Sequence, residues 1–568
     1  MTSLEARTVP LEAAGHESQH ESPASGVSRV GALEVAILVA LAVLGAVIRA
    51  RGFTSNDLWF DDAWAAAPAR VGLADAIHMV LTAPGYGLAI RSWIRLDPAT
   101  TWFAQLPAYV LGLVAIPAVW GLFRGLRLPR WSALGAAGIL AAGPLAVQYS
   151  TRVKEYPFDL LAACLLLALA ERVRVAPSAS RLWALAAASV VAFAMSAGPA
   201  PVIAGIWLAV ICWSAMSSTS LSKLAGPLAT VAAGCGLVWV ALLRRLPSVL
   251  SFNWRRRGFL VDYRSFSLAE RTVTMIFGGF VHAVFAYPVP PSFFNTKRGL
   301  HAASAALLGL VLFAVAIIGP IVIAARRRWS APALPSALAL AVAVLLAVAD
   351  RVPLGDGRTD EVLYPAFLVC LASVAVAVAP RVARAVPRLG VAHAWRWGLS
   401  AVALAGAAAF GLSHEAVYPT VSLRGVDARL IALERPGDVV FVDTFNSFAW
   451  CYYELSACRF KVGGTPVWPQ GFSPVSTSPH VFIASHYGIP LPEFTAAQSR
   501  ARRIWYVGYT YGTFDVGAGP AKANLPVGTY MLGLLQRDGW RPAPPSVTTV
   551  ILGLHAYAVL YTKGGTQT

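Results

Sequence analysis

Long intervals without any charged residue constrain the fold of this chain more than any other feature. A helix that crosses a bilayer needs roughly 20 apolar residues, so each such interval predicts a membrane span. The longest interval, 182–222, can hold two spans, divided by the turn Ser196–Pro201. The intervals that contain no Asp, Glu, Lys or Arg are 98–123, 131–151, 182–222, 301–325, 329–349, 362–380 and 397–414.

Three further apolar stretches, 31–50, 157–171 and 224–243, raise the predicted number to about eleven spans. The composition agrees, since apolar residues make up 57% of the chain and charged residues only 13%. Because a soluble protein carries nearer a quarter charged residues, this chain cannot cover itself with a polar surface. A soluble multidomain protein, a collagen-like chain and a disordered chain are all excluded.

The basic residues predict which way the helices run. The net charge is +18, and in a membrane protein such an excess reflects Lys and Arg in short cytoplasmic loops rather than a nucleic-acid surface. A cytoplasmic N-terminus places all the basic loops inside, and an odd number of spans then puts the C-terminus outside. We therefore expect a multi-pass protein of the cell membrane with no nucleic-acid partner. The residues that decide this are Arg124, Arg127, Arg130, Arg172, Arg174, Arg181, Lys223, Arg326, Arg327, Arg328, Arg381, Arg384, Arg388 and Arg396.

The predicted domains follow from this topology. Residues 1–30 form a polar, disordered cytoplasmic tail, and 31–414 form an all-α transmembrane domain with external loops 51–97 and 244–300. Residues 415–568 form a small extracytoplasmic α/β domain. Its expected strands are Asp438–Val442, Ile504–Tyr509 and Tyr557–Tyr561, with a helix near Tyr530–Gln536.

Two cysteines of this last domain, Cys451 and Cys458, are seven residues apart. A disulfide between them is feasible outside the cytoplasm, but the spacing does not decide whether it forms. No cysteine spacing in the chain resembles a zinc or haem site.

Polar residues gather at the predicted outer ends of the helices, which places a candidate site at the external membrane face. The first cluster is the pair Asp61–Asp62, just after the first span. Neighbouring carboxylates raise one another's pKa, and an ionised carboxylate in a partly dry site can take a proton from a hydroxyl group. The alternative is a helix-capping Asp with a solvated neighbour.

The second cluster, Tyr149–Pro157, lies between the third and fourth spans. Pro157 suits the first turn of a helix that runs inward, so the helix N-terminus and the cations Arg152 and Lys154 together favour a phosphate. Glu155 and Asp159 share a face and can balance those cations or bind a metal. The alternative is a salt-bridged loop at the membrane interface.

The third cluster, Asp350–Glu361, precedes the tenth span. Arg358 can serve as another phosphate ligand, with Asp360 close by in sequence, and the glycines on either side of Asp356 permit a close backbone approach. The alternative is a hydrophilic turn. Three clusters at one face favour a functional site over three unrelated loops.

With these motifs the chain resembles the GT-C superfamily of membrane glycosyltransferases, which use polyprenyl-phosphate sugars as donors. Asp61–Asp62 matches that superfamily's acidic motif in the first external loop. Arg152, Lys154, Glu155 and Tyr156 are similar to its basic-aromatic second external loop, and Gly357–Arg358 precedes a late span. Asp62 stands where many members have Glu, so the resemblance leaves the division of roles within the pair open.

The resemblance implies an inverting sugar transfer to an envelope glycan, glycolipid or protein, with Asp61 as general base. Asp62 would be the second catalytic acid. Arg152, Lys154 and Arg358 would bind the donor phosphate, and Glu155, Tyr156 and Asp360 would support the site. Some members use a divalent cation and others use none, and the metal is undetermined here. The alternatives are a lipid-linked oligosaccharide flippase or exporter and a noncatalytic assembly protein.

Overall fold

The computed structural model describes most of the helical part of the chain and much of the C-terminal part. The described residues are 31–55, 57–58, 60–79, 81, 83–216, 222–244, 302–327, 331–349, 351–352, 354, 360–385, 423–454, 456–462, 472–484, 491–510, 533–551 and 554–563. The predicted tail 1–30, the predicted span 397–414, Arg358 and nearly all of the loop 244–300 lie outside them.

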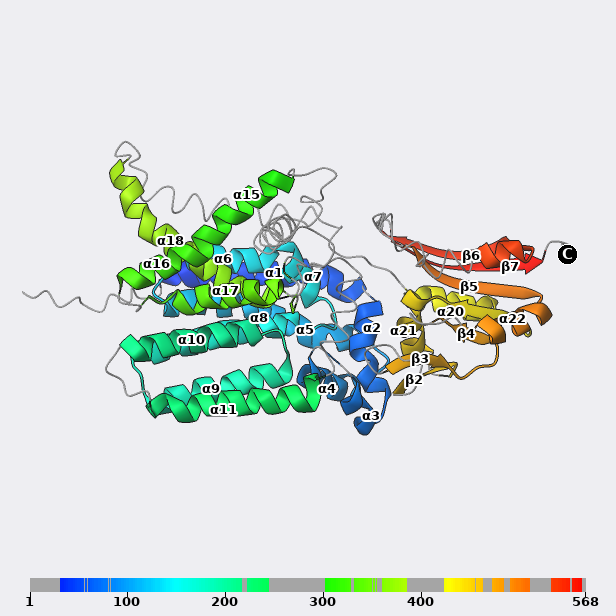
Figure 1. The fold of residues 1–568 in the computed structure, drawn as a ribbon. Coiled ribbons are helices and arrows are strands. Elements are labelled where there is room, and N and C mark those ends of the chain that lie inside the picture. Colours follow the sequence, from blue (N-terminus) through cyan, green and yellow to red (C-terminus); the bar gives the residue numbers. More distant parts are fainter. Residues whose placement is uncertain are drawn as a thin grey trace, which may run out of the picture.

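Long helices form one bundle, and each predicted span within the described residues lies on a helix or a helix pair (Figure 1). Among the described residues, five helical segments are long and apolar enough to cross a membrane, and a bent pair makes up to six. Together with the composition, these helices make the chain an integral membrane protein. The helices of the bundle are α1 (Ala32–Ser55), α5 (Thr101–Gly125), α6 (Arg130–Ala142), α7 (Pro144–Ser150), α8 (Tyr156–Val175), α9 (Ala179–Met195), α10 (Ala200–Met216), α11 (Ser222–Val238) with the π-helical turn η2 (Trp239–Leu243), α15 (Ala302–Phe313) with the π-helical turn η5 (Ala314–Ile318), α16 (Gly319–Arg326), α17 (Leu334–Val348) and α18 (Tyr364–Ala385).

The predicted span 131–151 differs from expectation because it is two helices, α6 and α7, that meet at an angle of 54°. Pro144 begins α7 and has no N–H group to continue the ladder of α6. The carbonyl groups left at the end of α6 are bound by the buried guanidinium of Arg49 on α1. Its Nη1 donates to Ala141 O at 2.7 Å and its Nη2 to Leu140 O at 2.7 Å.

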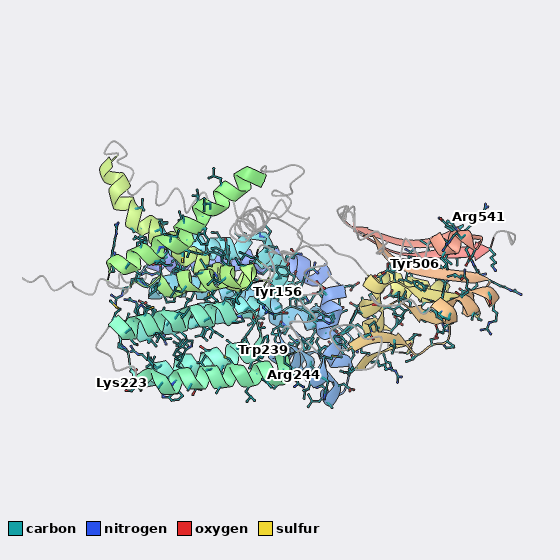
Figure 2. All side chains as sticks on the ribbon, viewed as in Figure 1. Tyr156, Lys223, Trp239, Arg244, Tyr506 and Arg541 are labelled. Carbon is teal, nitrogen blue, oxygen red and sulfur yellow. A yellow bond between two sulfur atoms is a disulfide. The ribbon has the colours of Figure 1, made fainter. Side chains whose placement is uncertain are left out.

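The two ends of the bundle carry different polar groups. At one end Glu34, buried at the start of α1, lies 3.2 Å from Arg124 Nε and accepts a hydrogen bond from Trp120 Nε1 at 3.0 Å. Figure 2 shows Lys223 at the end of α11 remote from the sheet domain and Arg244 near the opposite end. The described basic loops that contain Arg124 and Lys223 thus lie at the end that faces away from the sheet domain.

The first predicted external loop folds into short helices between the bundle and the sheet domain (Figure 1). They are α2 (Phe60–Ala66), the 3₁₀ turn η1 (Ala67–Arg70), α3 (Leu73–His78) and α4 (Pro84–Ile94). Their apolar side chains share a buried cluster with residues of the C-terminal domain, including Phe448 and Trp450. The loop is therefore a packed layer that joins the two parts of the molecule.

The C-terminal part is the predicted α/β domain. Its five-stranded sheet has the order β4-β1-β5-β7-β6, in which β4, β1 and β5 are parallel and the other two strands are antiparallel. The three strands expected from the sequence are β1, β5 and β7. The elements are α20 (Leu423–Leu433), β1 (Val439–Val442), α21 (Thr444–Tyr453), β2 (Cys458–Val462), β3 (Phe472–Ser476), β4 (Val481–Ile483), α22 (Leu491–Arg500), β5 (Arg503–Thr510), β6 (Trp540–Ile551) and β7 (Leu554–Lys563), with β2 and β3 forming a separate antiparallel pair. Residues 533–537 are helical and overlap the helix expected near Tyr530–Gln536.

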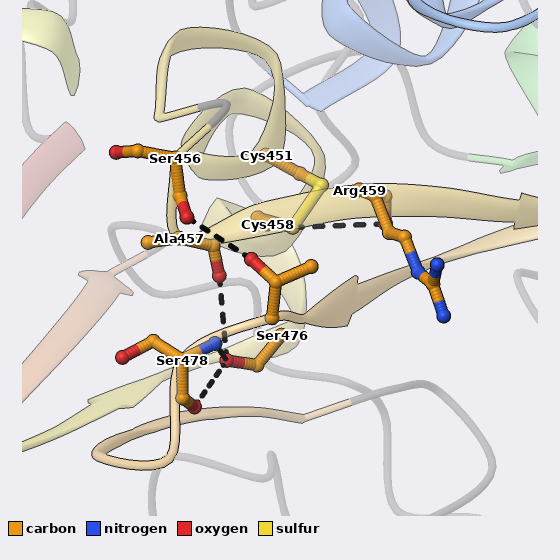
Figure 3. The surroundings of a disulfide bond; sticks show 8 residues. Cys451, Ser456, Ala457, Cys458, Arg459, Ser476 and Ser478 are labelled. Carbon is orange, nitrogen blue, oxygen red and sulfur yellow. Dashed lines mark hydrogen bonds between the residues drawn. A yellow bond between two sulfur atoms is a disulfide. The ribbon is translucent and has the colours of Figure 1, made fainter.

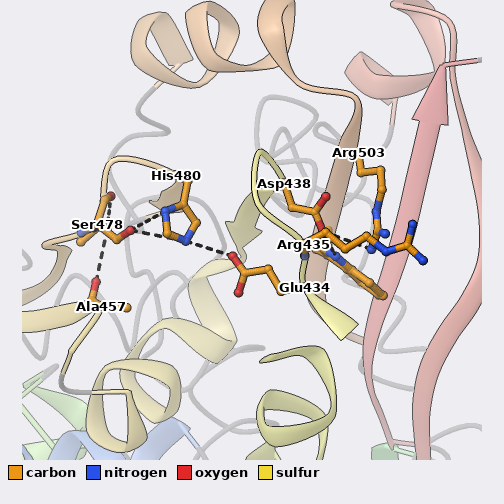
Figure 4. Close-up of polar contacts among 9 residues, drawn as sticks. Glu434, Arg435, Asp438, Ala457, Ser478, His480 and Arg503 are labelled. Carbon is orange, nitrogen blue, oxygen red and sulfur yellow. Dashed lines mark hydrogen bonds and ion pairs between the residues drawn. The ribbon is translucent and has the colours of Figure 1, made fainter. Parts of the chain in front are cut away.

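Polar contacts fix the amino ends of the parallel strands (Figure 4). Asp438, just before β1, accepts hydrogen bonds from Arg435 N at 2.9 Å and Trp505 Nε1 at 3.0 Å, and pairs with Arg503 at 3.1 Å. Because β1 and β5 begin side by side, one buried carboxylate ties both strands together.

Cys451 and Cys458 form a disulfide with a Cα–Cα distance of 5.0 Å, which settles the question that their spacing left open. The bond joins the end of α21 to the start of β2 (Figure 3). The other four cysteines are unpaired and lie on helices of the bundle.

The C-terminal domain is attached to the loop layer mainly through α21. The hydroxyl of Tyr453 accepts a hydrogen bond from Leu58 N at 2.8 Å and lies 3.5 Å from Thr101 Oγ1. The guanidinium of Arg70 lies over the ring of Tyr452, 4.1 Å from its centre. These aromatic and polar contacts hold α21 beside α2, the helix that carries the acidic pair.

Candidate functional site

The acidic pair lies in the first turn of α2, where carboxylates favourably meet the positive end of the helix. Asp61 is partly exposed, whereas Asp62 is buried. Burial raises the pKa of the Asp62 carboxyl, and Asp61 raises it further, against the opposing effect of Arg152 and Lys154. The two adjacent carboxylates therefore occupy different environments.

The predicted phosphate cations stand directly against this pair. Arg152 Nη1 lies 3.4 Å from Asp62 Oδ2, and both side chains are buried. The backbone N–H of Val153 also donates to Asp62. Lys154 Nζ lies 4.9 Å from the centre of the Trp64 ring on α2. Two segments about 90 residues apart are thus joined by an ion pair and a cation–π contact.

The chain folds this way locally because α7 ends at Ser150 and α8 begins at Tyr156. Val153 is fully buried in the apolar cluster of the loop layer, so the short turn between the helices keeps Arg152 and Lys154 close to α2. Pro157 lies in the first turn of α8, as expected. The N-terminus of α8 therefore lies beside two cations and two carboxylates.

Of the other predicted residues of this segment, Glu155 is buried and Tyr156 is half-buried. Glu155 immediately precedes α8 and is 7% exposed. Tyr156 packs its ring edge-on against Tyr149, with the ring centres 4.8 Å apart, and Figure 2 shows it at the junction of the bundle with the loop layer. Tyr156 thus has a packing contact that accounts for its half-buried position.

The third predicted cluster is only partly described. Arg358 lies outside the described residues, so its place in the site stays a prediction. Asp360 and Glu361 are buried at the start of η6 (Glu361–Leu363), a turn that packs against α8. This turn leads into α18 and brings two more carboxylates to the helix that follows Arg152 and Lys154.

Within the described part of the chain, no three His, Cys, Asp or Glu side chains are placed to hold a metal ion together. Glu155 and Asp159, which share a face in the sequence and could bind a metal, do not form such a group there.

One residue of the site, Tyr86 on α4, was missed by the sequence analysis. Its side chain is buried, and the carboxylates of Glu155, Asp159 and Asp62 act on its hydroxyl. Burial and then these three charges raise its pKa, so the hydroxyl keeps its proton. Nothing in the local sequence marks it, because only the packing of α4 against the bundle brings it to α8.

The arrangement combines groups with opposite chemical tasks. Arg152, Lys154 and the N-terminus of α8 favour an anion, and a phosphate is the anion that such a set binds well. Asp61, partly exposed in the same layer, can accept a proton from an incoming hydroxyl.

No family model matches the sequence, and no curated protein sequence is significantly similar to it. Among solved structures, the chain is similar to ArnT from Cupriavidus metallidurans in the apo state, at 15% identity and a TM-score of 0.48, over 93% of this chain and 97% of ArnT. It is similar to the same protein bound to undecaprenyl phosphate at 14% identity and a TM-score of 0.48, over 94% and 98% of the two chains. It is also similar to the oligosaccharyltransferase of Archaeoglobus fulgidus in the apo form, at 13% identity and a TM-score of 0.45, over 85% of this chain and 70% of that one.

Proposed function

We propose that the protein is a membrane glycosyltransferase of the GT-C type that takes a sugar from a polyprenyl-phosphate donor. The observation that carries the proposal is the contact between Asp62 of the acidic pair and Arg152 of the basic segment, at 3.4 Å. It supports a single site in which a proton acceptor and phosphate ligands lie side by side. The acceptor is an envelope glycan, a glycolipid or a protein.

The chemistry follows from the charges. An acceptor hydroxyl attacks the anomeric carbon of the donor sugar and forms the new glycosidic bond. The bond between that carbon and the phosphate oxygen breaks, and polyprenyl phosphate leaves with the bonding electrons. Asp61 takes the proton of the hydroxyl, while Arg152, Lys154 and Arg358 stabilise the negative charge that develops on the leaving phosphate.

Their different environments support different roles for the two acids. Asp62 is buried against Arg152, so it orients that cation and limits its movement. Asp61 is partly exposed, so it can meet a substrate hydroxyl. We therefore assign the base to Asp61 and the positioning of Arg152 to Asp62.

The site is proposed to lie at the extracytoplasmic face. Two observations support this sidedness. The basic loops lie at the opposite end of the bundle, as the positive-inside rule requires of a cytoplasmic end. The disulfide of the C-terminal domain belongs in an oxidising compartment. A donor that is already activated needs no nucleotide there.

The test is to incubate the purified protein with a panel of polyprenyl-phosphate sugars and acceptors, and to measure the release of free polyprenyl phosphate. The expected result is release with one donor class, abolished by Asp61→Asn in a variant that elutes and melts like the wild type. Turnover retained in Asp61→Asn would remove the base assignment. Lipid moved across vesicle membranes without chemical change would replace the transferase with a flippase.

A further inference from the structure

A second polar cluster lies near Asp62, and its residues come from α4 and α8. Tyr86 is 6% exposed, and its hydroxyl has no hydrogen-bond partner among the residues that the structure describes. The neighbouring acidic side chains are those of Glu155, Asp159 and Asp62, and each of them raises the pKa of the hydroxyl. The hydroxyl is therefore an uncharged donor buried among carboxylates.

Asp159, in the first turn of α8, is the partner of Tyr86 in this cluster. It is 4% exposed, and its Oδ1 atom has no hydrogen-bond partner within the described ranges. The Ser196 hydroxyl, in the turn between α9 and α10, bonds to the same carboxylate. A Cβ at Gly198 in that turn would collide with Asp159 Oδ2, so glycine lets the turn close over the carboxylate.

The position of Tyr86 is fixed by packing against the end of α9, next to the turn that covers Asp159. A Cβ at Gly85 would lie 2.6 Å from Ala194 O and 2.8 Å from Met195 Cα, so glycine allows α4 to pack directly on the end of α9. The ring of Tyr86 also packs against Phe158, with the ring centres 6.3 Å apart. Close backbone packing, the Ser196 hydroxyl and the Phe158 ring thus fix the two polar groups, which are not bonded to each other.

We propose that Tyr86 and Asp159 form a subsite for the hydroxyl groups of a sugar ring, beside the phosphate-binding cations. The proposal rests on the function proposed above and names the part of the substrate that this side of the site binds. A buried donor and a buried acceptor that lack partners are costly, and neighbouring sugar hydroxyls can satisfy both because each can donate and accept. A phosphate does not fit, since the groups that act on the Tyr86 hydroxyl are acids, with no cation among them.

The sugar can belong to the donor or to the acceptor, and kinetics separate the two. In Tyr86→Phe and Asp159→Asn we expect KM for one of the two substrates to rise about tenfold, which is the loss of roughly one hydrogen bond. A rise for the acceptor assigns the subsite to the acceptor sugar. A rise for the donor assigns it to the donor sugar.

Inhibition by sugar-free polyprenyl phosphate is the decisive second readout. Its inhibition constant should stay unchanged in Tyr86→Phe and Asp159→Asn, because that ligand has no sugar, and should rise in Arg152→Ala. Tyr109→Phe is the matched control, because the Tyr109 hydroxyl already donates to Ala46 O at 3.1 Å. This control should leave both KM values unchanged.

The outcomes are distinct. If the wild type releases no lipid phosphate from any donor, the proposed function fails. If the wild type is active but Tyr86→Phe keeps both KM values, or if its inhibition constant for polyprenyl phosphate rises as in Arg152→Ala, the sugar subsite is overturned. Should Asp159→Asn fold poorly, Tyr86→Phe alone decides, since it keeps the packed ring.

Discussion

At the scale of single residues, the pair of Asp62 and Arg152 is the central feature. The side chains are 2% and 7% exposed, so neither charge is well solvated, and each depends on the other. Removing one partner of a buried pair leaves an uncompensated charge, which is more damaging than the loss of a surface ion pair. Arg152 therefore contributes both to the stability of the site and to the binding of an anion.

Arg152→Ala should lower kcat/KM for the lipid-linked donor by about 100-fold, the usual cost of losing one donor to a developing negative charge. The measurement is initial-rate kinetics with a varied donor. Arg174→Ala is the matched control, because Arg174 lies at the other end of α8 and pairs with Glu171 at 2.6 Å. Equal effects of the two substitutions would contradict a specific role for Arg152.

At the scale of elements, the contact of α20 and α21 with the loop layer contains a buried acid, Asp427, with two half-buried acids near it. Burial raises the pKa of Asp427 on α20 well above its ordinary value, and the charges of Glu454 and Asp57 raise it further. Arg424 lowers the pKa of Glu454, although burial keeps it raised. The contact therefore favours a protonated Asp427.

This contact should weaken as the pH rises. Because the pKa of Asp427 is raised in the folded protein, the folded state holds a proton that the unfolded state has lost. The stabilisation from this group is then fully present below the pKa of the unfolded state, about 4. It is lost as the pH rises from there to the raised pKa of the folded state. Thermal unfolding of the purified protein at a series of pH values measures this. Asp427→Asn should flatten the pH dependence, and an unchanged slope would contradict the assignment.

The elements also differ in how far their sequences predict them. The apolar intervals predict the long helices well, because a span must be continuous and free of charge to cross a bilayer. The bend between α6 and α7 was not predicted, although Gly143–Pro144 lies at it. An apolar interval free of charge shows where a span lies, but it does not show where the backbone hydrogen bonds of a helix are interrupted. The strand β6 was missed because it contains prolines, which are rare inside strands.

At the scale of the whole molecule, the candidate site lies between the helical bundle and the sheet domain. The loop layer of α2, η1, α3 and α4 contacts both, so the C-terminal domain adjoins the helix that carries the acidic pair. The sidedness of the molecule then determines which compartment supplies the acceptor.

Two serine positions test that sidedness. Ser499 is exposed on α22 of the C-terminal domain, and Ser178 is exposed in the loop between α8 and α9 at the opposite end. In intact cells, an impermeant maleimide should label Ser499→Cys at once and Ser178→Cys only after permeabilisation. The reverse pattern would place the site in the cytoplasm and overturn the proposed topology.

The sequence by itself determined the membrane character of the chain, the positions of its spans, the small α/β domain and the grouping of polar residues at one end of the helices. These features follow from the hydropathy and charge of residues that are close together along the chain, so they need no knowledge of how distant segments pack. Only the tertiary structure decided that Asp62 meets Arg152, that Cys451 bonds to Cys458, and that Tyr86 lies near enough to Asp159 for the carboxyl to act on its hydroxyl. The side-chain arrangement at the site depends on how α2, α4 and α8 pack together, and the seven-residue spacing of the cysteines allows a bond without requiring one.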